Sequence, residues 1–237
     1  MLGYSKEDII RKCKDAFKDI KTFYKQPFIN YNGKTEDTNE YYTEVVAEFL
    51  CDNITEFKNG VVQITRGASY KTEGHDGRFD EDTPREEEKI AMEMFNQSKD
   101  GLQYDLIGNI IDYQTPLKNK RTDIAGKIDL LSYDGSTVHI LELKKPDSDE
   151  SMLRCVLEGY TYMQTIDNAK LLCDFGLPKE TVIKARCMDS FRLFHAQIVF
   201  SILLRLMVIL FVSVIYSKKQ MMRFLCSVTK MRQASFC

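Results

Sequence analysis

The feature that most constrains this chain is a pair of apolar segments joined by Asp134-Gly135. Residues 126–133 (GKIDLLSY) and 137–144 (TVHILELK) have the composition and length of β-strands. Asp-Gly between two such runs is a strong hairpin signal. Both segments carry Ile or Leu at consecutive positions, which is typical of strands buried on both faces. We therefore expect a hairpin inside the core of an α/β domain.

Charged residues interrupt this hairpin on one face. A two-residue Asp134-Gly135 turn pairs Tyr133 with Ser136 and sets Asp129 opposite Ile140. Because strand side chains alternate, Glu142 is then the diagonal neighbour of Asp129, and Lys144 follows on the same face. The plain alternative is a surface hairpin with a Glu–Lys pair. The surrounding apolar residues favour burial, and buried charges need a partner or a function.

Two carboxylates and a lysine suit metal-assisted hydrolysis. Carboxylate oxygens bind hard cations such as Mg²⁺, which keeps several waters when bound to protein. Such a cation can orient a phosphodiester and lower the pKa of a bound water. Lys144 could position that water, or help to deprotonate it if burial depresses the lysine pKa.

The other elements follow from periodicity. Apolar residues at helical spacing predict helices, one of them with Ser148 or Asp149 as N-cap, and β-rich runs predict further strands. The Gly-rich segment 66–84 reads as a loop. The expected helices are 5–24, 40–57, 85–97 and 148–166; the expected further strands are 107–116 and one that begins at 181–186. This order indicates an α/β fold.

The segment 126–146, GKIDLLSYDGSTVHILELKKP, resembles the core of the PD-(D/E)XK nuclease superfamily, in which an Asp is followed about a dozen residues later by Glu-x-Lys on the next strand. The resemblance covers about residues 85–186. It implies a restriction-endonuclease-like mixed β-sheet flanked by helices. It also implies hydrolysis of nucleic-acid phosphodiester bonds with Mg²⁺ or Mn²⁺, with DNA expected ahead of RNA as the partner. The implied catalytic residues are Asp129, Glu142 and Lys144.

The same resemblance implies further metal ligands. Besides Asp129 and Glu142, they are the main-chain carbonyl of Leu143 and a Glu on the preceding helix, which offers Glu86, Glu87 and Glu88. If the apolar face of that helix is Ile90, Ala91, Met94 and Phe95, Glu87 points most fully toward it. The alternative is that all three acids only interact favourably with the positive, N-terminal end of the helix dipole.

Five other residues are weaker candidates for a functional role. Arg154 and Gln164, on the helix after the motif, could contact nucleic acid, but a solvated or ion-paired surface role is favoured. His75 is expected to be a solvated loop residue. His139 should face away from Asp129, beside Leu130, and Cys155 should serve packing.

The C-terminal 51 residues differ in composition from the rest. Residues 1–186 carry a net charge of −8 and residues 187–237 carry +6, within a total of −2. The segment lacks Glu, Gly and Pro, and residues 196–216 are almost wholly apolar. A transmembrane helix, a buried helix and a shifted reading frame are open interpretations, and the abrupt change favours the last. Arg205 would cost a transmembrane helix roughly 2.5–3.5 kcal/mol.

These observations divide the chain into three parts: an N-terminal helical region and loop (1–84), the nuclease-like core (85–186) and the atypical basic and apolar tail (187–237). No signal peptide is recognisable, so we expect a cytoplasmic protein with free thiols. With a net charge of −2, nucleic-acid binding would need a local basic surface. Two other functions stay open: a catalytically silent nucleic-acid-binding module, and a membrane-anchored protein held through 196–216.

Overall fold

The structure of the protein is a computed structural model that describes residues 3–78, 85–119, 126–144 and 148–189. Its helical elements are α1 (Lys6–Ala16), the 3-10 helices η1 (Phe17–Lys25) and η2 (Pro27–Asn30), α2 (Tyr42–Asp52), α3 (Ile54–Gly60), α4 (Glu86–Lys99), α5 (Met152–Thr165) and α6 (Asn168–Asp174). Its strands are β1 (Asn109–Pro116), β2 (Lys127–Tyr133), β3 (Thr137–Lys144) and β4 (Val182–Asp189).

The strands form one mixed sheet in the order β1-β2-β3-β4. The pairs β1–β2 and β2–β3 are antiparallel, whereas β3–β4 is parallel and is connected through α5 and α6. The predicted α/β class with a mixed sheet flanked by helices is confirmed. The last strand continues to Asp189, three residues beyond the end that the sequence pattern indicated.

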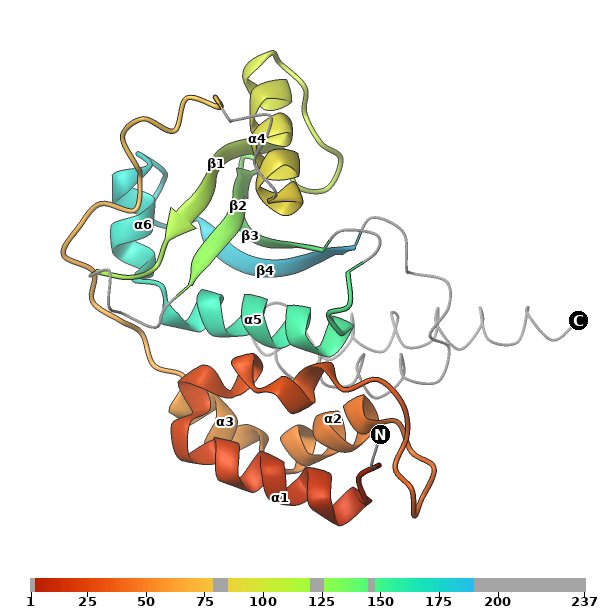
Figure 1. Ribbon diagram of the computed structural model, residues 1–237. Helices are drawn as coiled ribbons and strands as arrows, with labels where there is room; N and C mark the ends of the chain where they lie inside the picture. The colour runs from red at the N-terminus through yellow and green to blue at the C-terminus, as the bar shows by residue number, and fades with distance from the viewer. Residues whose placement is uncertain (1–2, 79–84, 120–125, 145–147, 190–237) are drawn as a thin grey trace, which may run out of the picture.

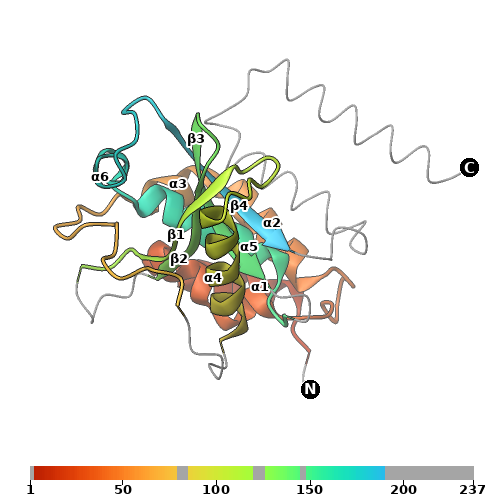
Figure 2. The same ribbon diagram turned by 90° about the horizontal axis from the view of Figure 1, so that it is seen from above.

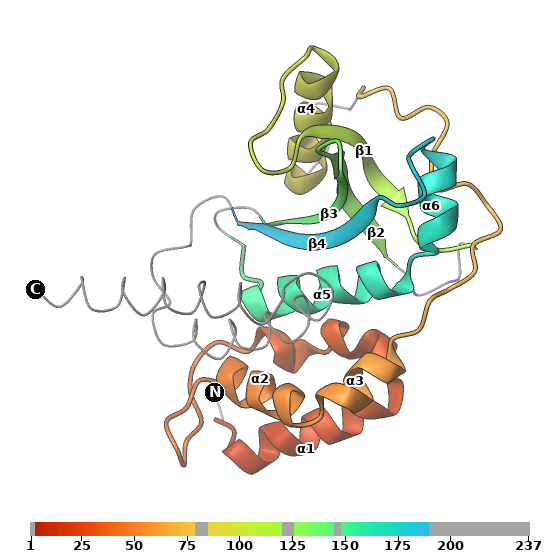
Figure 3. The same cartoon turned by 180° about the vertical axis from the view of Figure 1, so that it is seen from behind.

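Helices cover both faces of this sheet. Figure 1 shows α4 on one face, α5 on the other, and α1–α3 on the far side of α5. The view from above places α4 across the strands (Figure 2), and the view from behind shows the same layers (Figure 3). The layer order is therefore α4, sheet, α5 and N-terminal helices.

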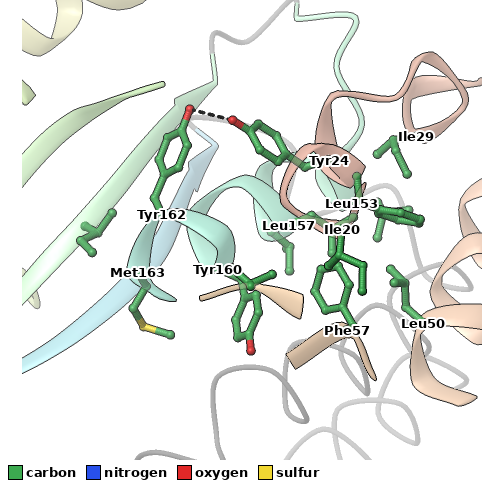
Figure 4. Close-up of a cluster of buried hydrophobic side chains, with 14 of the residues drawn as sticks. Ile20, Tyr24, Ile29, Leu50, Phe57, Leu153, Leu157, Tyr160, Tyr162 and Met163 are labelled. Carbon is green, nitrogen blue, oxygen red and sulfur yellow. Dashed lines mark hydrogen bonds between the residues drawn. The ribbon is translucent and has the colours of Figure 1, made fainter. Parts of the chain in front are cut away.

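Two hydrophobic clusters match these layers. The larger one joins the N-terminal helices, α5 and one sheet face, and it includes Ile9, Leu50, Leu157 and Ile140. Figure 4 shows part of it around α5. The smaller cluster lies between α4 and the opposite face, with Ala91, Met92, Leu130, Leu141 and Leu143. Side chains of β3 are thus buried on both faces, as the apolar composition predicted.

The hairpin register differs from the predicted one. Tyr133 pairs with Val138, and Leu130 pairs with Leu141, so the turn is centred on Gly135-Ser136 rather than on Asp134-Gly135. Gly135 has φ of 96° and takes the first central position, where type II′ turns favour glycine. Asp134 Oδ1 accepts hydrogen bonds from the N–H groups of Ser136 and Thr137 at 2.9 and 2.7 Å. The register moves by two residues, so every side chain keeps its predicted face.

Several helix boundaries also differ. The segment 5–24 divides into α1 and η1, where Asp19 leaves helical geometry, and 40–57 divides into α2 and α3 at Asn53. The N-cap of α5 is Ser151, whose side chain accepts from the N–H of Arg154, so the predicted caps Ser148 and Asp149 are wrong. Helix α6 was not predicted.

Among the residues placed by the structure, no helix has the length and apolarity that a membrane crossing requires. The apolar segment 196–216, on which the membrane interpretation rests, lies outside the described residues.

Candidate active site

Asp129 and Glu142 lie across from each other in the hairpin. Continued by one residue, the β2–β3 register sets these two residues opposite one another, not diagonally as predicted. Asp129 Oδ2 accepts a hydrogen bond from the N–H of Leu143 at 2.9 Å, and Oδ1 accepts one from Gln114 Nε2 at 3.2 Å. Burial raises the pKa of Asp129 to about 6, although the Leu143 N–H and the Lys144 charge oppose that rise.

Glu142 is a buried carboxylate with an unsatisfied oxygen. Its side chain lies under α5, where a Cβ added to Gly159 would stand 3.7 Å from Glu142 Cγ. Only 2% of the residue is exposed, and Oε1 has no hydrogen-bond partner among the residues that the structure describes. Burial raises the pKa of Glu142 well above its usual value, and the neighbouring charge of Asp129 raises it further. A buried carboxylate oxygen without a hydrogen bond is costly, so we expect a partner for Oε1.

Lys144 extends the same hairpin face toward α5. Its Nζ lies 2.7 Å from Glu150 Oε2 and 3.6 Å from Glu158 Oε2. Burial lowers the pKa of Lys144, but the two carboxylates outweigh it and the net shift is upward. A net fall in the pKa of Lys144, which is the condition for its acting as a base, is therefore not found in this structure, and we expect Lys144 to keep its positive charge.

An open cleft of about 460 Å³ lies beside Asp129, and its lining is strongly acidic. The lining residues are Arg85, Glu86, Glu87, Glu88, Gln114, Asp129, Ser148 and Glu150. The N-terminal turn of α4, the end of β1, β2 and the segment before α5 thus meet at one place.

The three glutamates of α4 differ in exposure and in their contacts. Glu87 is half-buried, and its charge helps to raise the pKa of Asp129, whereas Glu86 is exposed and Glu88 pairs with Arg85 at 3.1 Å. The apolar face used to choose Glu87 was partly wrong, because Ile90 is 37% exposed and Met92 takes its place in the core. Ala91 is buried as predicted, and the turn before it carries Glu87 toward the cleft.

Gln114 is a site residue that the sequence analysis missed. Its φ of 49° is left-handed, which is uncommon for a residue with a side chain, and this conformation occurs within β1. The side chain lines the cleft and donates to Asp129. Nothing in strand periodicity signals such a backbone, so only the structure reveals this contact. Strained conformations of this kind gather at functional sites.

Three of the weaker candidates lie on α5. Arg154 is ion-paired, with Nε 3.1 Å from Glu150 Oε1, as favoured. Gln164 lies ten residues further along α5, roughly 15 Å along the helix axis, so the structure does not bring it to this cluster. Cys155 is fully buried and packs with its Sγ 3.9 Å from the Glu142 carbonyl oxygen, as expected of a packing residue.

Both histidines considered earlier have carboxylate partners. His75 is not a solvated loop residue: its Nδ1 lies 2.7 Å from Asp112 Oδ1, and its ring stacks on Tyr113 at 4.4 Å. His139 Nε2 lies 2.9 Å from Asp134 Oδ2, and its strand partner is Ser132, not Leu130 as predicted. It lies on the face opposite Asp129, so its structural role agrees with the prediction.

Within the described residues, no group of three or more His, Cys, Asp or Glu side chains is arranged to hold a metal ion. Comparisons of the chain with protein-family models, with curated proteins and with solved structures find no match. The chemistry of the hairpin and its cleft is therefore what bears on function.

Proposed function

We propose that this chain is a metal-dependent nuclease of the PD-(D/E)XK type, with a restriction-endonuclease-like core, and that it hydrolyses phosphodiester bonds of nucleic acid. The observation that carries the proposal is Glu142, a buried carboxylate with an unsatisfied oxygen, beside Asp129 and on the same hairpin face as Lys144. A hairpin that served stability alone would not bury two carboxylates whose pKa values are both raised.

The donor set fits a hard divalent cation. Mg²⁺ is commonly bound through one or two carboxylates while it keeps several waters, and Asp129 and Glu142 supply two. The Oε1 atom of Glu142 has no hydrogen-bond partner among the described residues, so its lone pairs could coordinate a cation. Glu87 and the Leu143 carbonyl are the further ligands that the resemblance implies, and in this structure Glu87 does not yet form a three-carboxylate site with Asp129 and Glu142. When bound, the cation would offset phosphate charge and lower the pKa of a coordinated water.

The chain's own residues then have distinct tasks. Gln114 Nε2 and the Leu143 N–H hold the two oxygens of Asp129 in place. Lys144, kept charged by Glu150 and Glu158, attracts a phosphate or positions the attacking water, but does not remove its proton.

The test is cleavage of a panel of single- and double-stranded DNA and RNA, with Mg²⁺, with Mn²⁺ and with EDTA. The full chain should cleave at least one substrate in a metal-dependent way. Glu142→Gln, which keeps the side-chain volume, should lose this activity by about 10²-fold or more. Lys144→Ala should lose it as well.

A matched control is Lys179→Ala, which removes an exposed lysine from the α6–β4 connection. Wild-type cleavage by Glu142→Gln, or equal losses in the two lysine variants, would refute the site. Metal-independent binding of nucleic acid without any cleavage would favour a catalytically silent module instead.

A further inference from the structure

Glu150 lies between two cations at the edge of the cleft. One of its carboxylate oxygens, Oε2, is 2.7 Å from Lys144 Nζ, and the other, Oε1, is 3.1 Å from Arg154 Nε. The three side chains come from the end of β3, the segment before α5 and the first turn of α5. They bring two positive charges to one small anionic group.

Both cations are largely shielded from solvent. The side chains of Lys144 and Arg154 are 10% and 25% exposed, and that of Glu150 is 30% exposed. The contact with Arg154 is an ion pair of poor alignment, because the buried Nε of Arg154 forms no aligned hydrogen bond with any described residue. A planar carboxylate therefore fills this position without satisfying the Nε–H donor of Arg154. A tetrahedral phosphate, with oxygens in more directions, suits two such cations better.

The backbone around Glu150 allows its side chain to leave. Ser151, the N-cap of α5, is fixed to the N-terminal region: its N–H donates to Asn30 Oδ1 at 3.0 Å and its Oγ to the Ile29 carbonyl at 2.7 Å. Glu150 precedes this anchor and lines the open cleft. Its carboxylate can rotate toward solvent while Ser151 and α5 stay in place, so Lys144 and Arg154 keep their positions.

From this geometry we infer that Lys144 and Arg154 form a seat for a backbone phosphate of nucleic acid, and that the Glu150 carboxylate fills this seat until the phosphate displaces it. The inference rests on the proposed function and names how that site takes its substrate. Glu150 thus weakens binding of any polyanion, and only a ligand that fits both cations overcomes its competition. In an otherwise acidic cleft, such a seat also supplies the local basic surface that nucleic-acid binding by a chain of net charge −2 requires.

The experiment measures binding, not cleavage, in metal-free buffer with EDTA. Fluorescence anisotropy follows a labelled single-stranded DNA oligonucleotide and its RNA equivalent across a salt series. Glu150→Gln keeps the side-chain volume and removes the competing charge, so it should bind about tenfold more tightly than the full wild-type chain. The slope of log K against log salt should steepen by about 1–2, since two cations become available to phosphates.

Two further variants separate this inference from a general charge effect. Glu86→Gln removes one carboxylate from the same cleft, but on the exposed side of α4, and should change affinity by less than threefold. Adding Arg154→Gln to Glu150→Gln should abolish the gain. Thermal unfolding checks that each variant is folded, and Glu150→Ala should change affinity in the same direction as Glu150→Gln.

Equal affinity of wild type and Glu150→Gln, an equal gain in Glu86→Gln, or no binding by any variant would overturn the inference. Since no divalent metal is present, the outcome is independent of the cleavage assay. A chain that binds through this seat but never cleaves contradicts the nuclease proposal alone, whereas cleavage without the Glu150 effect contradicts only the seat.

Discussion

At the scale of single residues, Glu142 is expected to reduce stability in the absence of metal. Its raised pKa means that the folded state holds the proton more tightly than the unfolded state. Stability therefore decreases as pH rises through the interval between the unfolded and the folded pKa, and the penalty is complete above the folded value. In EDTA at pH 8, Glu142→Gln should raise the free energy of unfolding by roughly 1–3 kcal/mol.

Urea unfolding at several pH values checks this expectation. The advantage of Glu142→Gln should shrink as pH falls, because the wild-type carboxyl then becomes neutral as well. Glu180→Gln, at an exposed position, should show no such trend. A variant less stable than wild type at pH 8 without metal would mean that the carboxylate is well satisfied inside the protein.

Glu87 and Glu86 offer a second comparison at this scale. Glu87 is half-buried at the cleft and its charge acts on Asp129, whereas Glu86 is exposed. Glu87→Gln should raise the Mg²⁺ concentration needed for half-maximal cleavage by about tenfold, the lower end of losses typical around metal sites. Glu86→Gln should leave it within twofold. An unchanged Mg²⁺ dependence in Glu87→Gln would leave the α4 acids with only their effect on the helix dipole.

The site residues were predictable only where alternation decides the outcome. The common face of Asp129, Glu142 and Lys144 follows from a period of two, and it survived a register error because the shift was by two residues. Gln114 and Glu150 were not predictable, since one depends on a left-handed backbone within a strand and the other on the path of the chain before α5. Neither leaves a periodic signal in the sequence.

At the scale of elements, the β2–β3 hairpin depends on one glycine. Gly135 has φ of 96°, and a Cβ there would meet no atom within 4 Å, so Gly135→Ala adds backbone strain without a clash. The expected loss in the free energy of unfolding is about 1–2 kcal/mol. Gly67→Ala is a matched control, because a Cβ there also meets nothing and its φ is not left-handed. Equal effects of the two substitutions in urea unfolding would contradict the assigned turn.

Elements were predictable in type more than in extent. Each predicted strand exists, because β-rich apolar runs bounded by turns have few other solutions. The predicted helices 5–24 and 40–57 each divide in two, since apolar residues spaced for one face do not report a break such as Asp19 or Asn53. The buried face of α4 was only partly predicted, because Met92 rather than Ile90 is buried beside Ala91.

At the scale of the whole molecule, two hydrogen bonds and an ion pair connect the N-terminal region with Lys144. Tyr24 Oη donates to Tyr162 Oη at 3.5 Å, and Tyr162 Oη donates to Glu158 Oε1 at 2.8 Å (Figure 4 shows the two tyrosines). Glu158 in turn faces Lys144. Tyr162→Phe should cost roughly 1.5–3 kcal/mol of stability, because it removes a bond to a carboxylate that is only 13% exposed.

Tyr24→Phe is the natural comparison, since it removes only the long bond between the two hydroxyls and should cost less than 1 kcal/mol. Thermal or urea unfolding measures both. We also expect Tyr162→Phe to slow cleavage more than Tyr24→Phe does, because Glu158 helps to hold Lys144. Equal effects in both assays would show that the network does not act through Glu158.

The end of β4 supplies the last prediction, which concerns where the folded core stops. Composition changes after Arg186, yet the strand continues, and its last three residues pair in parallel with Glu142, Leu143 and Lys144. A chain that ends at Asp189 keeps the backbone partner of this segment of β3, whereas one that ends at Arg186 leaves it as an unpaired edge. Residues 190–237 lie outside the described part of the chain, and our prediction that they are dispensable rests on their composition.

We expect the full chain to express poorly in soluble form. The chain ending at Asp189 should be more soluble and should cleave nucleic acid, whereas the chain ending at Arg186 should lose both stability and cleavage. Soluble yield, urea unfolding and metal-dependent cleavage of the three chains test this, and sequencing the gene end should recover a polar, Glu-containing ending in a neighbouring frame. If 196–216 instead fractionates with membranes as an integral span, the tail is a native anchor and its removal should release the protein from the membrane.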